Sequence, residues 1–278
     1  MSNVLITGCS SGFGLLAALE FARRGDHVFA TMRDTSKAGD LQAAAAKESL
    51  DVQVLRLDLL DQSSIDAAIA EAQKAAPIDV LVNNAGFEVR SSVEDASEDE
   101  VRRQFETNVI GTLRVIKSVL PDMRKRGAGT IINLSSVAGI VGVPYAGYYS
   151  ASKHALEAIT ETMHYEVRPF GVRVALIEPG AFETSFGGNI VRAKRFNETS
   201  PYWGTSERFH VARGKLSNPE VVNDPQDVAK TIVEAAYTDT PRLRWLVGGD
   251  AQLIGAVRKQ TDFEGFEAAM RQTLDWWD

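Results

Sequence analysis

The sequence predicts a single α/β domain in which a parallel, doubly wound sheet of the Rossmann type is flanked by helices. Short apolar runs alternate with amphipathic stretches along the 278 residues. The apolar runs are continuous rather than alternating, which indicates strands buried on both faces and therefore a parallel sheet. A chain of this length, with 44% hydrophobic residues, can bury a full core as one domain.

The predicted elements follow one another in a regular order from the N-terminus. The first apolar run, 3–7, leads into glycines and then into a helical pattern at 15–24. Further apolar runs predict strands at 27–32, 52–57, 78–83, 130–135, 172–178 and 243–247. Amphipathic stretches predict helices at 41–47, 63–75, 98–125, 147–167 and 225–237. No strand is predicted in 181–223, which separates a core, 1–180, from a C-terminal part of the same domain, 224–278.

A glycine-rich turn joins the first predicted strand to the first helix. Its residues are Gly8, Cys9, Ser10, Ser11, Gly12, Phe13 and Gly14. We expect Gly8 to permit a tight turn, Gly12 to let backbone approach a pyrophosphate, and Gly14 to let the helix pack closely on the sheet. The helix N-terminus would offer free N–H groups to the phosphates. A flexible loop is the alternative, but the strand-to-helix junction and the lack of acidic residues in the turn favour a dinucleotide site.

A tyrosine and a lysine stand four residues apart in the predicted helix 147–167. At this spacing Tyr149 and Lys153 share one helix face. A lysine ammonium there favours the tyrosinate and can lower the pKa of the phenol from about 10 toward neutrality. Tyr149 would then act as a general acid for a carbonyl oxygen or as a base for an alcohol. The same spacing also occurs on solvated helix faces, so the glycine turn is what favours a catalytic pair.

These motifs together resemble those of the short-chain dehydrogenase/reductase family. The glycine pattern is G-x-x-x-G-x-G after a threonine, and Tyr149-x-x-x-Lys153 follows it. The other matching residues are Asn83-Asn84-Ala85-Gly86, Asn108, Ser135-Ser136, and Pro179-Gly180 with Thr184. They keep the family's order over roughly the first two thirds of the chain. The short segments 120–123 and 169–172 are most similar to those of the branch that contains hydroxysteroid and retinol dehydrogenases.

The resemblance implies a catalytic role for four residues, Asn108, Ser136, Tyr149 and Lys153. Lys153 would bind the nicotinamide ribose while tuning Tyr149, and Asn108 would hold a water that links Lys153 to solvent. The family's serine-to-tyrosine offset selects Ser136 over Ser135 to polarise the substrate carbonyl. Cofactor contacts are implied for the glycine turn, for Asn84, Ala85 and Gly86, for Tyr149 and Lys153, and for Pro179, Gly180 and Thr184.

Two further cofactor residues are expected where the third predicted strand ends. Asp58, beside Leu59, could accept a hydrogen bond from the adenine amino group. Alternatively, Asp58 is an acid at the start of the next helix, before Asp61, and the residues do not decide between the two roles.

The end of the second predicted strand favours NADP(H) as the cofactor. NAD-preferring relatives carry an acid where Met32 stands, and here Arg33 follows this apolar residue. A guanidinium beside the ribose 2′-position suits a phosphate, and Ser11 could donate another hydrogen bond. Alternatively, Arg33 is a solvated charge at the end of the strand, either free or paired with Asp34, which leaves NAD(H) open as the cofactor.

The aromatic-rich stretch 181–223 is predicted to form a substrate lid. Long insertions in compact domains are usually lids or binding loops. Its place after the sixth strand puts it over the carboxyl edge, where doubly wound sheets bind ligands. Alternatively, its aromatic side chains pack as a satellite core. The lid interpretation predicts substrate contacts from Phe182, Phe186 and Trp203.

Composition argues against several other functions. The net charge of -7, with no dense basic stripe, disfavours nucleic-acid binding. The four histidines form no ligand-spaced cluster, so no metal site is expected. The single cysteine, Cys9, is expected to be a buried turn residue. No apolar run is long enough to span a bilayer, and no signal peptide fits before the first strand, so we expect a cytoplasmic protein.

The sequence therefore predicts an oxidoreductase that uses NADP(H) on an apolar secondary alcohol, ketone or aldehyde of steroid, retinoid or aryl-ketone type. Tyr149 would exchange the proton while the nicotinamide carries the hydride. One alternative is a 3-oxoacyl-thioester reductase. Another is a non-catalytic NADP-binding scaffold or redox sensor, which would be expected to lack one of the four catalytic residues. The resemblance also implies a homodimer.

Overall fold

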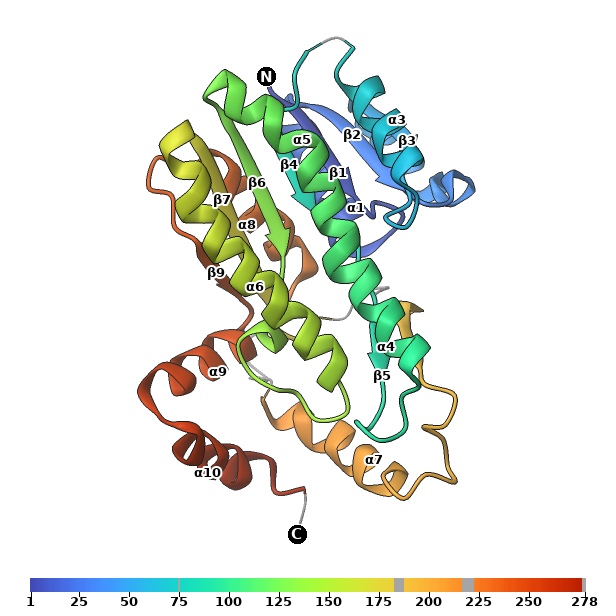
Figure 1. The fold of residues 1–278 in the computed structure, drawn as a ribbon, viewed down its shortest axis with the longest axis vertical. Helices are drawn as coiled ribbons and strands as arrows, with labels where there is room; N and C mark the ends of the chain where they lie inside the picture. Colours follow the sequence, from blue (N-terminus) through green and yellow to red (C-terminus); the bar gives the residue numbers. More distant parts are fainter. Residues whose placement is uncertain (75, 183–187, 217–222, 277–278) are drawn as a thin grey trace.

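The centre of the molecule is a seven-stranded parallel sheet with the strand order β3-β2-β1-β4-β6-β7-β9 (Figure 1). The computed structural model describes residues 1–74, 76–182, 188–216 and 223–276. The strands are β1 (Asn3–Thr7), β2 (His27–Met32), β3 (Val52–Arg56), β4 (Val80–Asn83), β6 (Gly129–Leu134), β7 (Val172–Pro179) and β9 (Arg244–Val247). The predicted doubly wound parallel sheet is confirmed.

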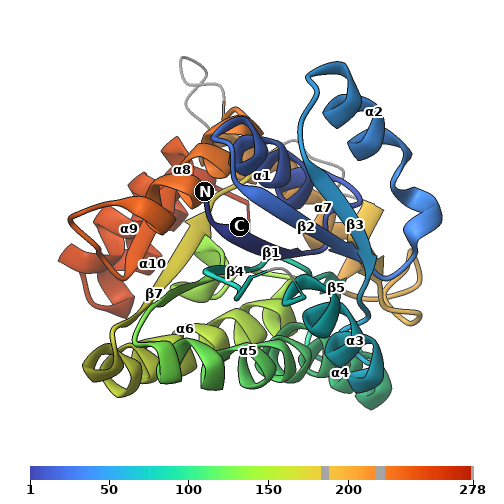
Figure 2. The same cartoon turned by 90° about the horizontal axis from the view of Figure 1, so that it is seen from above.

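Helices cover both faces of this sheet, as Figure 2 shows from above. One face carries α1 (Gly12–Arg23), α2 (Gly39–Lys47) and α8 (Pro225–Tyr237). The other carries α3 (Gln62–Ala72), α4 (Glu98–Phe105), α5 (Thr112–Arg126) and α6 (Gly147–Val167). In β1, Val4 and Ile6 pack with the α1 side and Leu5 packs with the other side. This alternation buries both faces of the apolar centre of the strand, residues 4–6, which explains the continuous apolar pattern.

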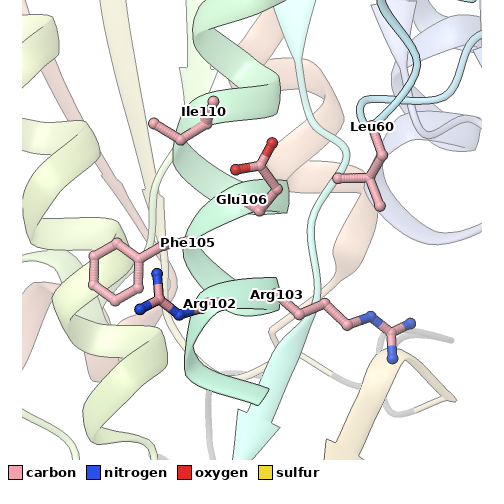
Figure 3. Close-up of a pocket in the computed structure, with 6 residues that line it drawn as sticks. All are labelled: Leu60, Arg102, Arg103, Phe105, Glu106 and Ile110. Atoms are coloured by element: carbon pink, nitrogen blue, oxygen red, sulfur yellow. The ribbon is translucent and has the colours of Figure 1, made fainter. Parts of the chain in front are cut away.

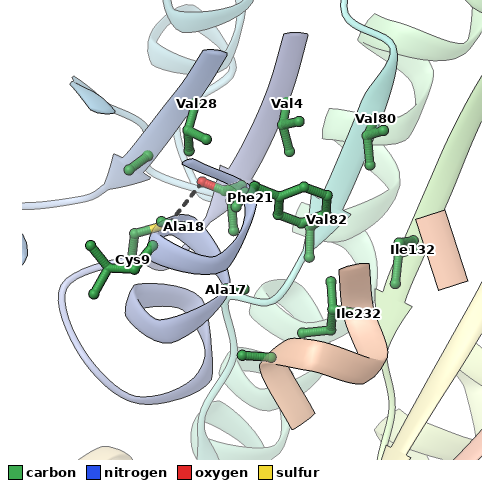
Figure 4. Close-up of a cluster of buried hydrophobic side chains, with 14 of the residues drawn as sticks. Val4, Cys9, Ala17, Ala18, Phe21, Val28, Val80, Val82, Ile132 and Ile232 are labelled. Atoms are coloured by element: carbon green, nitrogen blue, oxygen red, sulfur yellow. Dashed lines mark hydrogen bonds between the residues drawn. The ribbon is translucent and has the colours of Figure 1, made fainter. Parts of the chain in front are cut away.

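The core on the α1 side reaches the glycine turn through Cys9 (Figure 4). Cys9 is buried, and its thiol donates to the carbonyl oxygen of Ile6 at 3.3 Å. Burial raises the pKa of this thiol, so Cys9 fills space as a neutral group. Its predicted role as a buried turn residue is confirmed.

The helix predicted at 98–125 is interrupted by a π-helical segment at Glu106–Gly111, between α4 and α5. Single π-helical turns inside longer helices are frequent at functional sites. This segment contains Asn108, whose side chain is directed into the protein and is 2% exposed. The periodicity of the sequence shows the long helix but not the local change in its hydrogen bonding.

The prediction that 181–223 contains no strand is wrong. Ile190–Arg192 forms β8, which pairs in parallel with β5 (Glu88–Arg90). Three-residue strands are too short to show a period in the sequence. The same stretch contains α7 (Trp203–Ala212), and the C-terminal part adds α9 (Gly249–Gln260) and α10 (Phe263–Leu274). Among the described residues, no helix is both long and apolar enough to cross a bilayer.

Candidate active site

The glycine turn after β1 has the conformation that its glycines predict. Gly8 and Gly12 have φ angles of +75° and +59°, in the left-handed region that disfavours other residues. A Cβ on Gly8 would lie 2.8 Å from the Cα of Ala85. A Cβ on Gly14 would overlap the Asn84 amide and the Gly8 carbonyl. The turn therefore packs backbone to backbone against the residues that follow β4.

Asn84 ties the glycine turn to the end of β4. Its amide Nδ2 donates to the carbonyl oxygens of Thr7, at 2.9 Å, and Gly8, at 3.0 Å. In return, the Thr7 hydroxyl accepts from the backbone N–H groups of Asn84 and Ala85, at 3.0 and 3.1 Å. These bonds join the carboxyl ends of two neighbouring strands, where doubly wound sheets bind dinucleotides.

The α1 N-terminus and the end of β2 carry polar groups that could hold a cofactor. Ser11 is the N-cap of α1, but its side chain makes no capping bond. Arg33 is exposed and forms no ion pair within the described part of the chain. This exposure also fits the alternative of a solvated strand-end charge, although Arg33 forms no ion pair with Asp34. Asp34 accepts bonds from Ser36, which lower the pKa of its carboxyl group. Met32 is 3% exposed and belongs to the core.

Two acidic residues after β3, Asp58 and Asp61, have different roles. Asp61 is the N-cap of α3 and accepts from the Ser64 N–H, so the capping role belongs to Asp61. Asp58 is partly buried, and one of its carboxylate oxygens accepts from Leu60 N–H at 3.0 Å. Leu59 is 6% exposed, and its carbonyl accepts from Arg114. Asp58 therefore lies in the turn that precedes α3, and its contact with the adenine stays a prediction.

Two of the four expected catalytic residues are fixed by backbone carbonyl groups. The ammonium of Lys153, a residue that is 6% exposed, donates to the Leu134 carbonyl at 2.6 Å and lies 5.7 Å from the centre of the Tyr149 ring. Asn108 Nδ2 donates to the Phe87 carbonyl at 2.9 Å and to the Ser152 hydroxyl at 3.2 Å. The π-helical segment thus holds Asn108 against Ser152 of α6, the residue that precedes Lys153.

The structure brings Ser136, rather than Ser135, to Tyr149. Ser136 hydrogen-bonds with Tyr149, accepts from Ala138 N–H at 3.1 Å, and donates to the Pro179 carbonyl at 3.4 Å. Ser135 lies instead beside Gly139, where a Cβ would lie 2.5 Å from its hydroxyl. The two adjacent serines therefore have different neighbours.

The pKa of the Tyr149 phenol differs from the expectation based on the sequence. Burial of the phenol raises the pKa of Tyr149, and the nearby charge of Glu88 raises it further, while the bond from Ser136 opposes both. Burial lowers the pKa of Lys153 to about 8, against the charge of Glu157. The expected lowering of the phenol pKa is thus absent from this structure, because desolvation and the charge of Glu88 outweigh the bond from Ser136. The sequence analysis missed Glu88 because this residue belongs to none of the recognised motifs.

The loop after β7 is held by two residues that the sequence analysis missed. A Cβ on Gly180 would overlap the carboxylate of Asp250, which also accepts from Ala181 N–H at 2.7 Å. Asn223 donates to the Ala181 carbonyl at 2.8 Å and to Asp250 at 3.0 Å. Asp250 is 5% exposed. These contacts position the Pro179–Gly180 turn; Thr184, which was expected to contribute there, lies outside the described residues.

The described aromatic side chains of 181–223 pack among themselves and against neighbouring elements. Phe182 meets Phe13 of the glycine turn edge to face, with ring centres 5.5 Å apart. Phe196 stacks on Tyr145 and also contacts Trp203, with both pairs of centres 5.8 Å apart. These contacts match the satellite-core alternative. Phe186 lies outside the described residues.

Tyr145 links this satellite core to the catalytic helix. It has a φ angle of +61° and stands four residues before Tyr149. A non-glycine residue in this region is strained, and such residues cluster at functional sites. The packed aromatic side chains therefore support the chain just before the candidate catalytic tyrosine.

Two hollows of the surface are lined by residues other than Tyr149. One, of about 450 Å³, is lined by Leu60, Arg102, Arg103, Phe105, Glu106 and Ile110 around the π-helical segment (Figure 3). Another, of about 690 Å³, lies between α8, β9 and α9 and includes Phe182. Within the described ranges, no group of three or more His, Cys, Asp or Glu side chains is placed to hold a metal ion.

Comparison with known proteins identifies the family. Residues 2–195 match the family model described as short chain dehydrogenase. The "Uncharacterized oxidoreductase YusZ" of Bacillus subtilis is 37% identical, with 97% of each chain covered. Human "17-beta-hydroxysteroid dehydrogenase type 1" is 36% identical over 87% of this chain and 76% of its own. The actinorhodin polyketide ketoreductase, solved with NADPH, has a TM-score of 0.77 and 26% identity, over 90% of this chain and 97% of its own. The chain therefore belongs to the short-chain dehydrogenase family and is an NAD(P)-dependent oxidoreductase.

Proposed function

We propose that this protein is an NADP(H)-preferring oxidoreductase that interconverts an apolar secondary alcohol and its ketone or aldehyde, with Tyr149 as the proton-transfer residue. The observation that carries the proposal is the convergence of Tyr149, Ser136 and Lys153 beside the carboxyl ends of β6 and β7. A phenol, a hydroxyl and an ammonium can together bind an oxygen atom whose charge changes during the reaction.

The residues around the glycine turn fit a dinucleotide. Gly8 and Gly14 leave no room for a side chain, while the N-terminus of α1 has an N-cap whose hydroxyl makes no capping bond. This combination offers backbone N–H groups to a pyrophosphate at close range. Ser11 and Arg33 would hold the adenosine end, and Lys153 with the Pro179–Gly180 turn would hold the nicotinamide end. When bound, the nicotinamide supplies or accepts the hydride.

The chain's own residues move the proton. In the direction of reduction, Tyr149 Oη–H donates its proton to the carbonyl oxygen, and the Ser136 hydroxyl donates a hydrogen bond to the same oxygen. The raised pKa of Tyr149 keeps the phenol protonated at neutral pH, which is the form that reduction needs. Oxidation of an alcohol would need the phenolate, and it would therefore be favoured at higher pH.

Arg33 and Ser11 support the choice of NADP(H). The guanidinium of Arg33 is exposed and has no ion-pair partner among the described residues, so a phosphate would not have to displace a carboxylate. Buried Met32 offers no acceptor to the ribose hydroxyls that NAD(H) carries at this position. The ketoreductase with 26% identity was solved with NADPH, which agrees with this choice.

An apolar substrate is supported by the hydroxysteroid dehydrogenase among the relatives. A 3-oxoacyl thioester remains the second candidate substrate, because one structural neighbour is named a polyketide ketoreductase.

A homodimer is also proposed. Leu60 and Ile110, which line the outer hollow of Figure 3, are 47% and 41% exposed and offer apolar surface for a second copy.

A substrate screen tests the proposal. Purified protein is incubated with NADPH or NADH and with steroid ketones, retinal, aryl ketones or a 3-oxoacyl thioester, and the loss of cofactor absorbance is followed. We expect reduction of an apolar ketone, a higher kcat/KM with NADPH, and no turnover by Tyr149→Phe. Turnover of the thioester alone would replace the substrate class. Binding of NADPH without turnover of any member of the panel would favour the scaffold alternative.

A further inference from the structure

A buried group of charged residues lies behind Lys153, and the reaction proposed above does not use it. Glu157 follows Lys153 by one helical turn on α6 and is 5% exposed. Glu178 lies near the end of β7, just before the Pro179–Gly180 turn, and is 1% exposed. Carboxylates are rarely buried so completely unless they are paired. Each of them therefore needs a partner that accounts for its charge.

Arg244 on β9 is the cation that both carboxyl groups share. Its Nε lies 3.1 Å from Glu157 Oε2 and 3.4 Å from Glu178 Oε1. Its Nη2 lies 2.5 Å from Glu161 Oε2, on the more exposed side of α6. One guanidinium thus faces three carboxyl groups, two of which are buried. Two buried carboxylates beside each other repel, so one of them favours its protonated form.

Two of the carboxyl oxygen atoms indicate where that proton lies. Glu157 Oε1 and Glu178 Oε1 are both buried and lack a hydrogen bond of good geometry within the described chain. Glu178 Oε1 has the ion pair with Arg244 at 3.4 Å, and the Ser135 hydroxyl acts on the Glu157 carboxyl group. A proton held by one carboxyl group and donated to the other would give both oxygen atoms such a hydrogen bond. Shared protons of this kind occur where two carboxyl groups occupy one site.

We propose that Glu157 and Glu178 share one proton at neutral pH, and that Glu157 bears the remaining negative charge and is a positioning residue for the Lys153 ammonium. The catalytic part of this inference rests on the proposed function. Lys153 and Glu157 are four residues apart on one helix face, and both are buried. Lys153 forms no ion pair with a carboxylate of the described residues, and its ammonium donates to the Leu134 carbonyl. Glu157 therefore supplies the negative charge that helps to keep this amine protonated inside the protein.

The charges around the pair agree with this assignment. Burial and the charge of Glu157 raise the pKa of Glu178 to about 8, while Arg244 and Lys259 of α9 oppose this. Burial also raises the pKa of Glu157, against Arg244 and the Ser135 hydroxyl. Glu157 is the charged group that acts on Lys153, and it raises the lysine pKa. The proton accordingly stays on Glu178, and the negative charge lies on the side of the lysine.

The test compares two isosteric changes that each replace one carboxyl group by an amide. In Glu178→Gln, the amide replaces a protonated acid and can still donate to Glu157. In Glu157→Gln, the remaining carboxyl group is the one farther from Lys153 along the chain. Glu161→Gln is the control, because this third partner of Arg244 has a side chain that is 46% exposed. At neutral pH, Glu157→Gln and Glu161→Gln each remove one negative charge, whereas Glu178→Gln replaces a neutral acid by a neutral amide.

The first readout does not depend on activity. Lysine is labelled with 13C at Cε, Lys153 is assigned through Lys153→Arg, and its titration is followed by NMR. We expect Glu157→Gln to lower the Lys153 pKa by about 1, the low end of the effect of a nearby opposite charge. Glu178→Gln and Glu161→Gln should leave it unchanged. In 13C-glutamate protein, a carboxyl group that titrates near pH 8 should disappear in Glu178→Gln. Equal shifts of the lysine in Glu157→Gln and Glu178→Gln, or no high-titrating glutamate, would overturn the assignment.

The second readout is the pH dependence of kcat with a ketone that the wild type reduces. In Glu157→Gln the alkaline loss of activity should move to lower pH, whereas Glu178→Gln should keep the wild-type profile. A merely structural role would lower the rate at all pH values without moving the profile. If the wild type reduces no ketone, the proposed function fails, but the NMR titrations still decide whether the proton is shared. If ketones are reduced and the lysine titration does not move in Glu157→Gln, only the present inference fails.

Discussion

The ammonium of Lys153 donates to the backbone carbonyl of Leu134 at 2.6 Å. Leu134 ends β6, and Ser136 follows two residues later. The bond therefore attaches the catalytic helix α6 to the strand whose end carries the serine, and it holds the lysine before any ligand arrives. Preorganised groups of this kind save the reorganisation that a flexible lysine would need during the reaction.

Tyr149→Phe should lower kcat by about 10²–10⁴-fold, the usual contribution of a general acid or base. The affinity for NADPH should stay close to that of the wild type, because only the phenol oxygen is removed. Steady-state rates and fluorescence titration of the cofactor measure the two quantities. Tyr148→Phe is the matched control, since Tyr148 donates to the Val93 carbonyl and not to the site. A Tyr149→Phe enzyme within threefold of the wild-type rate would contradict the assignment.

Arg33→Ala should weaken NADP(H) binding by about 1.5–3 kcal/mol, the range for hydrogen bonds to charged groups, with little change for NAD(H). The ratio of kcat/KM for the two cofactors measures this. The neighbouring change Met32→Asp is a poorer test, because Met32 is 3% exposed and an aspartate there would bury a carboxylate. Equal losses for both cofactors would mean that Arg33 does not contact the 2′-phosphate.

Gly14→Ala should lower the free energy of unfolding by about 1–3 kcal/mol, as overpacking usually does, and should impair cofactor binding. The added methyl group would overlap the Asn84 amide and the Gly8 carbonyl, so the glycine turn would have to move. Gly39→Ala, at the start of α2, is the control, because nothing lies within 4 Å of its Cβ position. Urea unfolding and NADPH titration of both variants decide the matter. Similar behaviour of the two variants would show that the turn is not closely packed.

Glu178→Gln should change how stability depends on pH. The pKa of Glu178 rises from 4.5 to about 8 on folding, so its contribution is complete below pH 4.5 and is lost as the pH rises toward 8. Glutamine has no such dependence. The stability of the variant relative to wild type should therefore increase by up to about 1.4 kcal/mol per pH unit across this window. Urea unfolding at pH 5, 6.5 and 8 measures it, and a constant difference would refute the raised pKa.

Trp203→Ala tests whether the stretch 181–223 contacts substrate. Trp203 packs on Phe196 and under the guanidinium of Arg192, at 4.3 Å from the ring centre. As a lid residue, its loss should raise KM for a large apolar ketone more than for a small one. As part of a satellite core, its loss should lower the melting temperature and affect both ketones equally. Comparing KM for the two ketones with the melting temperature separates the two outcomes.

Much of the architecture follows from short-range patterns in the sequence. The apolar runs predict all seven strands of the central sheet close to where they lie, because burial on both faces requires continuous apolar residues. The order of strand, glycines and helix marked Gly8 and Gly14 in the sequence, although the groups that exclude a side chain there include Ala85 and Asn84, which are distant along the chain. The order of Ser136, Tyr149 and Lys153 along the chain also pointed to residues that the fold brings together at the ends of β6 and β7.

Only the tertiary structure decided which distant charges meet. Arg244 lies 87 residues from Glu157, and Asp250 lies 69 residues from Ala181. The hydrophobic periodicity of the sequence does not predict such pairs, because they depend on how β9 and α9 pack beside β7. The pairing of β5 with β8 and the π-helical turn at Asn108 are likewise settled by long-range contacts. Burial then changes the chemistry: desolvation raises the pKa of Tyr149 and Glu178 and lowers that of Lys153, and desolvation exists only once the chain has folded.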